Sequence, residues 1–179
     1  MGDLRMILRA VAVAAALALP AAAQDVVDLA PVEDAVADFD AAFRAGDMEA
    51  VLEAAPPTLM RTMADAFGME VDALVVGMSA ALSEAIADVT FEDLEMDVAG
   101  AETGRSETGR AYAKIPTSVT MALADGTRVA SSTTTLAIED GGAWYLVRID
   151  DGQQIAMLRE AFPDMAAVEF TAGTMEELD

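Results

Sequence analysis

AYAKIPTSVTMALADGTRVASSTTTLAI, residues 111–138, is the stretch that decides the fold. Its first half alternates in the manner of a half-buried β-strand. Ala113, Ile115, Val119, Met121 and Leu123 face one way, and Tyr112, Lys114, Ser118 and Thr120 the other. Asp125-Gly126 is a strong signal for a tight turn, and the run from Val129 to Ile138 is β-branched and rich in hydroxyls. The stretch therefore predicts an antiparallel hairpin.

Two further strands flank this hairpin. Upstream, Leu94, Met96 and Val98 alternate with acidic residues. Downstream, a turn at 140–142 leads into the strand 143–150, which has one apolar face: Ala143, Tyr145, Val147 and Ile149. Between the first two strands, residues 102–110 contain the duplicated Glu-Thr-Gly-Arg, which predicts a mobile loop.

The remaining segments have helical spacing. Pro31 fits a first helical position, and Gly46 ends that helix. Asp47 caps a second one at 48–55, and helices follow at 59–67, ended by Gly68, at 70–89 and at 153–162. We expect an α+β fold with N-terminal helices packed on one face of a curved antiparallel sheet of about four strands, plus a C-terminal helix. Residues 31–165 would form one domain, after a leader at 24–30 and before a flexible acidic tail at 166–179.

The N-terminus has the pattern of a secretory signal peptide. Arg5 and Arg9 precede the apolar run 10–19, Pro20 breaks it, and three alanines end at Ala23. The run is well short of the roughly 20 residues that span a bilayer, so no membrane span is expected. We predict cleavage after Ala23 and a soluble periplasmic or secreted protein.

Composition excludes several function classes. The formal charge is −22 for the whole chain and −23 without residues 1–23. Such a surface repels nucleic acid and attracts a cationic partner or divalent cations. The chain has no His, Cys or Asn, which removes disulfides, zinc sites, Ser-His-Asp triads and N-glycosylation. Met60 and Met63 without a His are a poor copper site, and we expect no metal and no cofactor.

Two segments resemble the nuclear transport factor 2-like superfamily of cone-shaped α+β domains, which includes ketosteroid-isomerase-like and polyketide-cyclase-like members. Phe39-Asp40-Ala41-Ala42-Phe43-Arg44-Ala45-Gly46-Asp47 looks like its first helix and Gly-Asp step, and Asp140-Gly141-Gly142-Ala143-Trp144-Tyr145-Leu146-Val147 like its penultimate strand. The resemblance implies a pocket between helices and sheet, often for a small apolar ligand. Isomerase members use a carboxylate base with Tyr and acid donors, but no motif here places those residues by position.

A few side chains are candidates for chemistry. Asp40 borders the apolar stripe of the first helix and is a candidate general base if an apolar wall raises its pKa; alternatively it pairs with Arg44. Tyr112 and Tyr145 are candidate donors to a ligand, although Tyr145 also suits core packing. Trp144, on the opposite face from Tyr145, suits either a contact surface or an edge packed by the terminal helix.

Three cations lie within ten residues of an otherwise acidic chain: Arg105, Arg110 and Lys114. They suit an anionic ligand or another subunit's acids, or they are neutralised by the nearby Glu102 and Glu107.

Three functions follow as hypotheses. The first is a non-enzymatic binder of a small apolar ligand or a protein. The second is a carboxylate-based isomerase or cyclase with Asp40 as base. The third is an accessory subunit that pairs through the Ser- and Thr-rich sheet face. A homodimer is a separate hypothesis for the partner.

Overall fold

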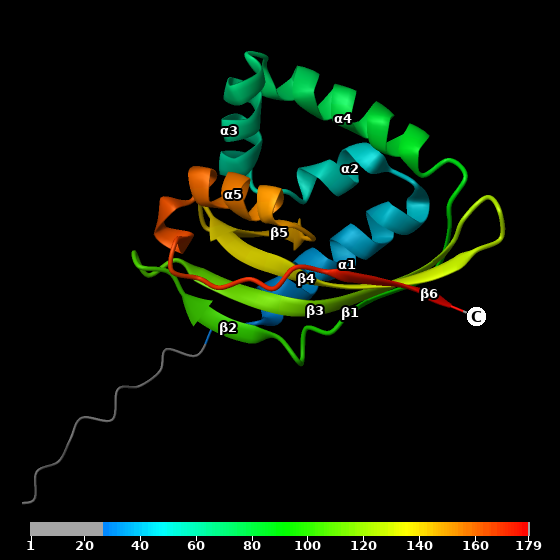
Figure 1. The fold of residues 1–179 in the computed structure, drawn as a ribbon. Helices are drawn as coiled ribbons and strands as arrows, with labels where there is room; N and C mark the ends of the chain where they lie inside the picture. Colours follow the sequence, from blue (N-terminus) through cyan, green and yellow to red (C-terminus); the bar gives the residue numbers. More distant parts are fainter. Residues whose placement is uncertain (1–26, 179) are drawn as a thin grey trace, which may run out of the picture.

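A computed structural model describes residues 27–178 (Figure 1). The predicted signal peptide at 1–23 and residues 24–26 of the leader lie outside the described residues. The order of elements confirms the α+β class: helices come first, a curled antiparallel sheet follows, and a helix comes after the fifth strand. No single helix among residues 27–178 is long and apolar enough to cross a membrane; only α3 and α4 together, bent by 92°, reach that length and hydropathy.

Glycines and acidic caps place the helix ends largely where the sequence predicts them. Helix α1, Ala30–Ala45, ends at Gly46, whose φ of 70° is left-handed and whose N–H donates to the last turn. Asp47 accepts from Ala50 N at 3.1 Å and caps α2, Met48–Glu53. Helix α3, Pro57–Phe67, ends at Gly68, and α4 spans Val71–Ala85, four residues shorter at its C-terminal end than the predicted 70–89.

The predicted hairpin forms the centre of the sheet. Strand β3, Ala111–Ala122, pairs with β4, Arg128–Asp140, from Tyr112↔Ile138 to Ala122↔Arg128. On either side lie β1, Thr90–Met96, and β5, Ala143–Ile149. The register of β1 shifts between Phe91 and Asp93, and such a bulge bends and twists a strand.

Two strands correct the prediction of about four. Strand β2, Glu102–Arg105, pairs with β3 where a mobile loop was predicted, and β6, Thr174–Leu178, pairs with β4 where a flexible tail was predicted. Each occupies an edge that another strand leaves open: β5 pairs with residues 134–140 of β4, and β6 with residues 128–132. Within residues 27–178 the sheet therefore has six strands.

The core lies on both faces of the sheet, because successive residues of β4 point to opposite sides. Ala137 packs in a cluster with Val32 of α1 and Leu146, whereas Leu136 and Ile138 pack with Leu158 and Phe162. The latter two come from α5, Gly152–Ala161, and the residue that follows it. Helices thus cover both faces, and residues 135–138 are all buried.

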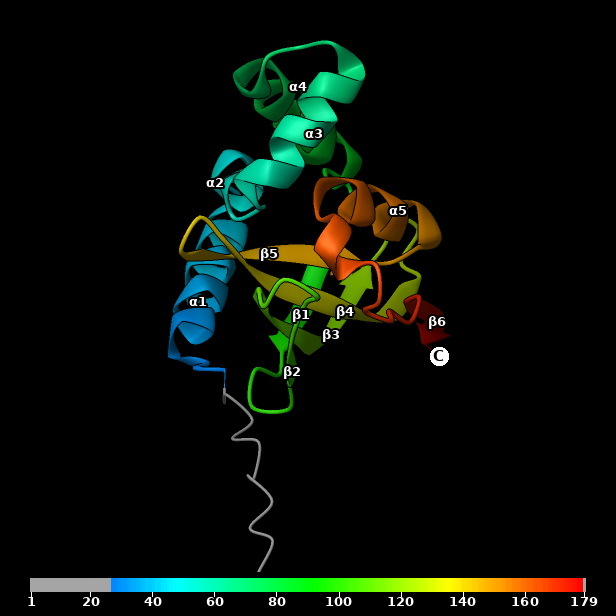
Figure 2. The same ribbon diagram turned by 90° about the vertical axis from the view of Figure 1, so that its left-hand side faces the viewer.

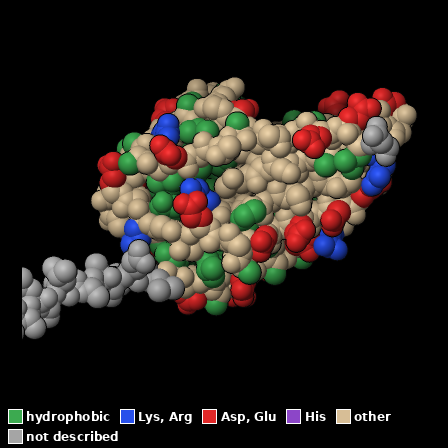
Figure 3. Space-filling view, turned by 60° about the horizontal axis from the view of Figure 1, so that its bottom comes forward, with side chains coloured by type: hydrophobic (Ala, Val, Ile, Leu, Met, Phe, Trp, Pro, Cys, Tyr) green, Lys and Arg blue, Asp and Glu red, His purple; other side chains and the backbone are tan. Residues whose placement is uncertain are grey.

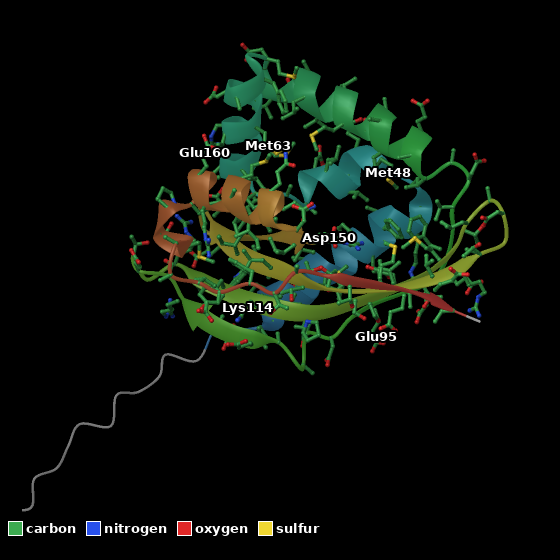
Figure 4. All side chains as sticks on the ribbon, viewed as in Figure 1. Met48, Met63, Glu95, Lys114, Asp150 and Glu160 are labelled. Carbon is green, nitrogen blue, oxygen red and sulfur yellow. The ribbon has the colours of Figure 1, made fainter. Side chains whose placement is uncertain are left out.

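Helix α3 joins the core on the α5 side of the sheet. Leu59 of α3 joins the α5 cluster, so not every N-terminal helix packs on the α1 face as predicted. Met63 of the same helix packs against this cluster and is labelled in Figure 4. Helix α4 turns away from α3 and extends over α2 (Figures 1 and 2).

Candidate functional site

An apolar cavity of about 300 Å³ lies on the α1 face of the sheet. Helix α1, the C-terminal part of α4 with the segment after it, and strands β1, β3, β4 and β5 contribute its walls. The lining consists of Phe39, Phe43, Leu82, Ile86, Val89, Phe91, Leu94, Met96, Thr117, Val119, Met121, Thr135, Leu146 and Arg148. Ligand pockets span about 300–1,000 Å³, so this volume suits a small molecule.

Three aromatic rings form one wall of the cavity. Phe39 and Phe43 are one helical turn apart on α1 and stack with ring centroids 6.0 Å apart. Phe91 of β1 meets Phe43 edge to face at 4.8 Å. Both are favourable geometries for aromatic pairs, so the wall is held in place by contacts between the helix and the first strand.

The polar groups in the lining are few and already engaged. Thr117 and Thr135, both buried, join their hydroxyls at 2.8 Å, and the Thr117 hydroxyl also lies 3.2 Å from the Ile115 carbonyl oxygen. Whichever way the two protons point, Thr135 keeps hydrogen-bonding capacity for a ligand. Arg148 donates to Asp150 at 2.8 Å and to Ser131 at 3.2 Å, so its charge is compensated within the chain.

Asp40 does not line this cavity. Its carboxylate accepts from Arg44 Nε at 2.8 Å, which is the pairing of residues four apart that the sequence offered as the alternative. Asp40 instead lines two hollows between α1 and the β1 segment. Among the described lining residues of the apolar cavity there is no carboxylate at all.

The three aromatic candidates lie in different surroundings. Tyr112 packs against the α5 cluster, and its ring lies over Gly104, where an added Cβ would clash with the hydroxyl. Trp144 packs against the cluster of α1, so α1 covers its face, and the terminal helix α5 lies on the opposite face. Tyr145 does not belong to either cluster, and together with Trp144 it lines a second hollow beside α1 and α2.

The three predicted cations do not converge on one site. Arg105 donates to the carbonyl of Gly109 at 3.0 Å, and Lys114 pairs with Glu102 at 2.8 Å. Figure 4 shows Lys114 at the end of the sheet near β2. Arg110 lies with its guanidinium carbon 4.9 Å from the ring centroid of Phe162. Only the Lys114–Glu102 pair matches the alternative of neutralisation by nearby glutamates, since Arg105 contacts a neutral carbonyl and Arg110 pairs with Asp164.

Asp164 is the centre of the network around Arg110. Its Oδ2 accepts from Ser106 at 2.6 Å, Thr108 at 2.8 Å and Arg110 Nε at 3.1 Å. Burial raises the pKa of the Asp164 carboxyl, but these hydrogen bonds and the positive charge of Arg110 lower it by more, so the pKa lies below its ordinary value of 3.8. The network ties the β2–β3 loop to the segment after α5 and is structural in character.

Sequence reasoning missed Thr117, Thr135 and Arg148 as lining residues. A signal was present for Thr117, because it interrupts the apolar positions between Ile115 and Val119 at a buried position. Arg148 gave no such signal, since its neighbours in space come from another strand. In the described part of the chain, no three acidic side chains converge to hold a metal ion.

The Ser- and Thr-rich face predicted for pairing is partly open. Ser118 and Ser132 are exposed and directly opposite each other in the register of β3 and β4. On the face shown in Figure 3, acidic side chains outnumber basic ones.

No family model, no curated protein and no solved structure matches this chain. The resemblance to the nuclear transport factor 2-like superfamily therefore stays a prediction.

Proposed function

We propose that this protein binds a small, largely apolar molecule in the cavity between α1, α4 and the sheet, without a catalytic step. The observation that carries the proposal is a hollow of about 300 Å³ whose lining is apolar except for two threonines and one compensated arginine. Removing apolar ligand surface from water contributes roughly 25 cal/mol per Å². A ligand seated here would gain most of its affinity in this way.

The polar groups and the charge of the chain restrict the chemical class of the ligand further. The Thr135 hydroxyl keeps hydrogen-bonding capacity beyond its contact with Thr117, whereas Arg148 is already paired with Asp150. The chain carries a net charge of −22, which repels anions at long range. These features favour an uncharged ligand with one hydroxyl or carbonyl group. The enzymatic alternative would need a carboxylate at the wall, and Asp40 lies outside the lining.

We also propose that binding takes place outside the cytoplasm. This part rests on the sequence alone: Arg5 and Arg9 before a short apolar run, and small residues up to Ala23. An exported binder that lacks Cys and His has no thiol or imidazole to oxidise or to capture metals, which suits a carrier or sensor of apolar metabolites.

The experiment is a titration with the neutral fluorescent probe N-phenylnaphthylamine, read by its fluorescence and by native mass spectrometry. Val119→Phe places a ring into the cavity, since Val119 is buried in the lining, and should weaken the probe at least about tenfold, or about 1.4 kcal/mol. Val76→Phe makes the same change on exposed α4 surface outside the lining and should leave affinity unchanged.

Two results would reject the proposal: no saturable one-to-one binding by the wild type, or equal binding by both variants. If Val119→Phe does not fold, Met121→Phe tests the same wall, because Met121 also lines the cavity and is only half-buried.

A further inference from the structure

A second hollow, of about 310 Å³, lies between α1, α2 and the start of β5. Four of its ten lining residues are alanines: Ala35 and Ala42 come from α1, and Ala50 and Ala54 from α2 or its end. Because a methyl group is small, the alanines leave the space that forms the hollow. The rest of the lining is Asp38, Phe39, Glu53, Trp144, Tyr145 and Leu146.

The frame of this hollow is held by the backbone. The N–H of Leu146 donates to the carbonyl oxygen of Ala54 at 2.8 Å, which joins β5 to the end of α2. Trp144 packs against the α1 cluster, so the indole is supported from the side of the core. Phe39 and Leu146 also line the apolar cavity, but the remaining lining residues of the two hollows differ.

Charge in this hollow is of one sign. Asp38 of α1 and Glu53 of α2 are exposed, and no Lys or Arg is among the lining residues. Within residues 27–178 neither carboxylate makes an ion pair or a hydrogen bond, whereas Asp40, Asp150 and Asp164 are all paired with arginines. The overall charge of −22 adds to the negative potential.

We propose that this second hollow binds an organic ammonium ion, with its positive head between the indole of Trp144 and the two carboxylates. Among aromatic side chains, an ammonium group is attracted most strongly to the face of Trp, and Trp144, on the α1 face of β5, lines this hollow. A divalent metal does not fit as well, since Ca²⁺ takes six to eight oxygen ligands and the two carboxylates, Asp38 and Glu53, supply at most four. The inference is independent of the apolar cavity and its ligand.

Trp144 provides the readout, because it is the only tryptophan in the chain and it lines this hollow. Choline chloride is titrated into the purified protein at constant ionic strength, with sodium chloride replaced stepwise, and indole fluorescence is followed. The uncharged carbon isostere 3,3-dimethylbutanol is titrated in parallel. We expect saturation by choline below about 100 mM, a dissociation constant of the millimolar class, and at least tenfold weaker binding of the isostere.

A matched pair of double variants separates local from long-range charge. Asp38→Asn with Glu53→Gln removes the two carboxylates of the hollow. Asp34→Asn with Glu49→Gln makes the same charge change on the same two helices, at exposed positions outside the lining. The first pair should weaken choline at least tenfold, and the second less than twofold.

Three outcomes would overturn the proposal: equal affinities for choline and its isostere, equal losses in the two double variants, or no saturable change in the fluorescence of a wild type with native circular dichroism. A failure of N-phenylnaphthylamine binding alone would reject the apolar-ligand function and leave this site standing.

Discussion

Phe162 provides the sharpest test of the architecture. Its ring is 1% exposed between α5 and the sheet, in the cluster that also holds Leu136 and Leu158. Truncation of a buried Phe to Ala costs about 3–5 kcal/mol. The guanidinium of Arg110, 4.9 Å from the ring centroid, would add about 0.5–1 kcal/mol to that loss. We therefore expect Phe162→Ala to lower the free energy of unfolding by about 3.5–6 kcal/mol.

Phe67 is the matched control, because it is 62% exposed at the end of α3. Phe67→Ala should change the free energy of unfolding by less than about 0.5 kcal/mol. The assay is urea and thermal unfolding followed by circular dichroism. For a chain of this size each kcal/mol moves Tm by about 2–4 °C, so Phe162→Ala should melt at least about 7 °C below the wild type.

The reasoning is refuted if the two alanine variants melt within about 2 °C of each other. Such a result would mean that α5 and the segment after it do not belong to the cooperative core. Should Phe162→Ala fail to fold, Phe162→Leu supplies the measurement, with an expected loss between those of the wild type and the alanine variant.

Four further predictions concern two glycines, one carboxylate and the N-terminus of the exported protein. Gly77 lies in the middle of α4 with nothing within 4 Å of an added Cβ, so Gly77→Ala should raise the free energy of unfolding by about 0.5–1 kcal/mol. Gly46 has a φ of +70°, so Gly46→Ala should lower the free energy of unfolding by about 1–2 kcal/mol. Urea unfolding measures both. Asp164→Asn should cost about 1–3 kcal/mol at neutral pH. Because folding lowers the pKa of this carboxyl, its contribution is present above the ordinary value of 3.8 and is lost as pH falls through the folded pKa, so wild type and variant should converge in acid; a gap that persists unchanged at low pH would contradict this. Intact mass of the exported protein should match a chain that begins at Gln24, and a mass that retains the apolar run would contradict cleavage after Ala23.

Much of the fold was predictable because its signals are local. Gly46 and Asp47 end one helix and start the next through their own backbone and side-chain geometry. The Asp125-Gly126 turn sets the register of β3 and β4, and the alternation from Ala113 to Val119 places the buried face. Period and turn chemistry act over a few residues, so one chain suffices to read them.

The two missed strands show where such signals end. Glu102–Arg105 and Thr174–Leu178 have no apolar alternation, and both are mostly exposed. They form strands because β3 and β4 are longer than their main partners and leave unpaired edges. An edge with unpaired N–H and C=O groups is a template for pairing, but only the assembled sheet shows which edge is open.

The candidate site, too, depends partly on local sequence and partly on the tertiary structure. By itself the sequence determined which side chains are available: apolar stripes on α1, α4, β1 and β3, an acidic chain without thiol or imidazole, and an N-terminal pattern for export. The tertiary structure decided where these side chains lie. It turned Phe39, Val119 and Leu146 toward one cavity, left Asp40 outside with Arg44, and brought Trp144 and Tyr145 beside Asp38 and Glu53. Side-chain periodicity is a property of one element, whereas a cavity depends on how six elements curve and cover one another, and no local pattern encodes that.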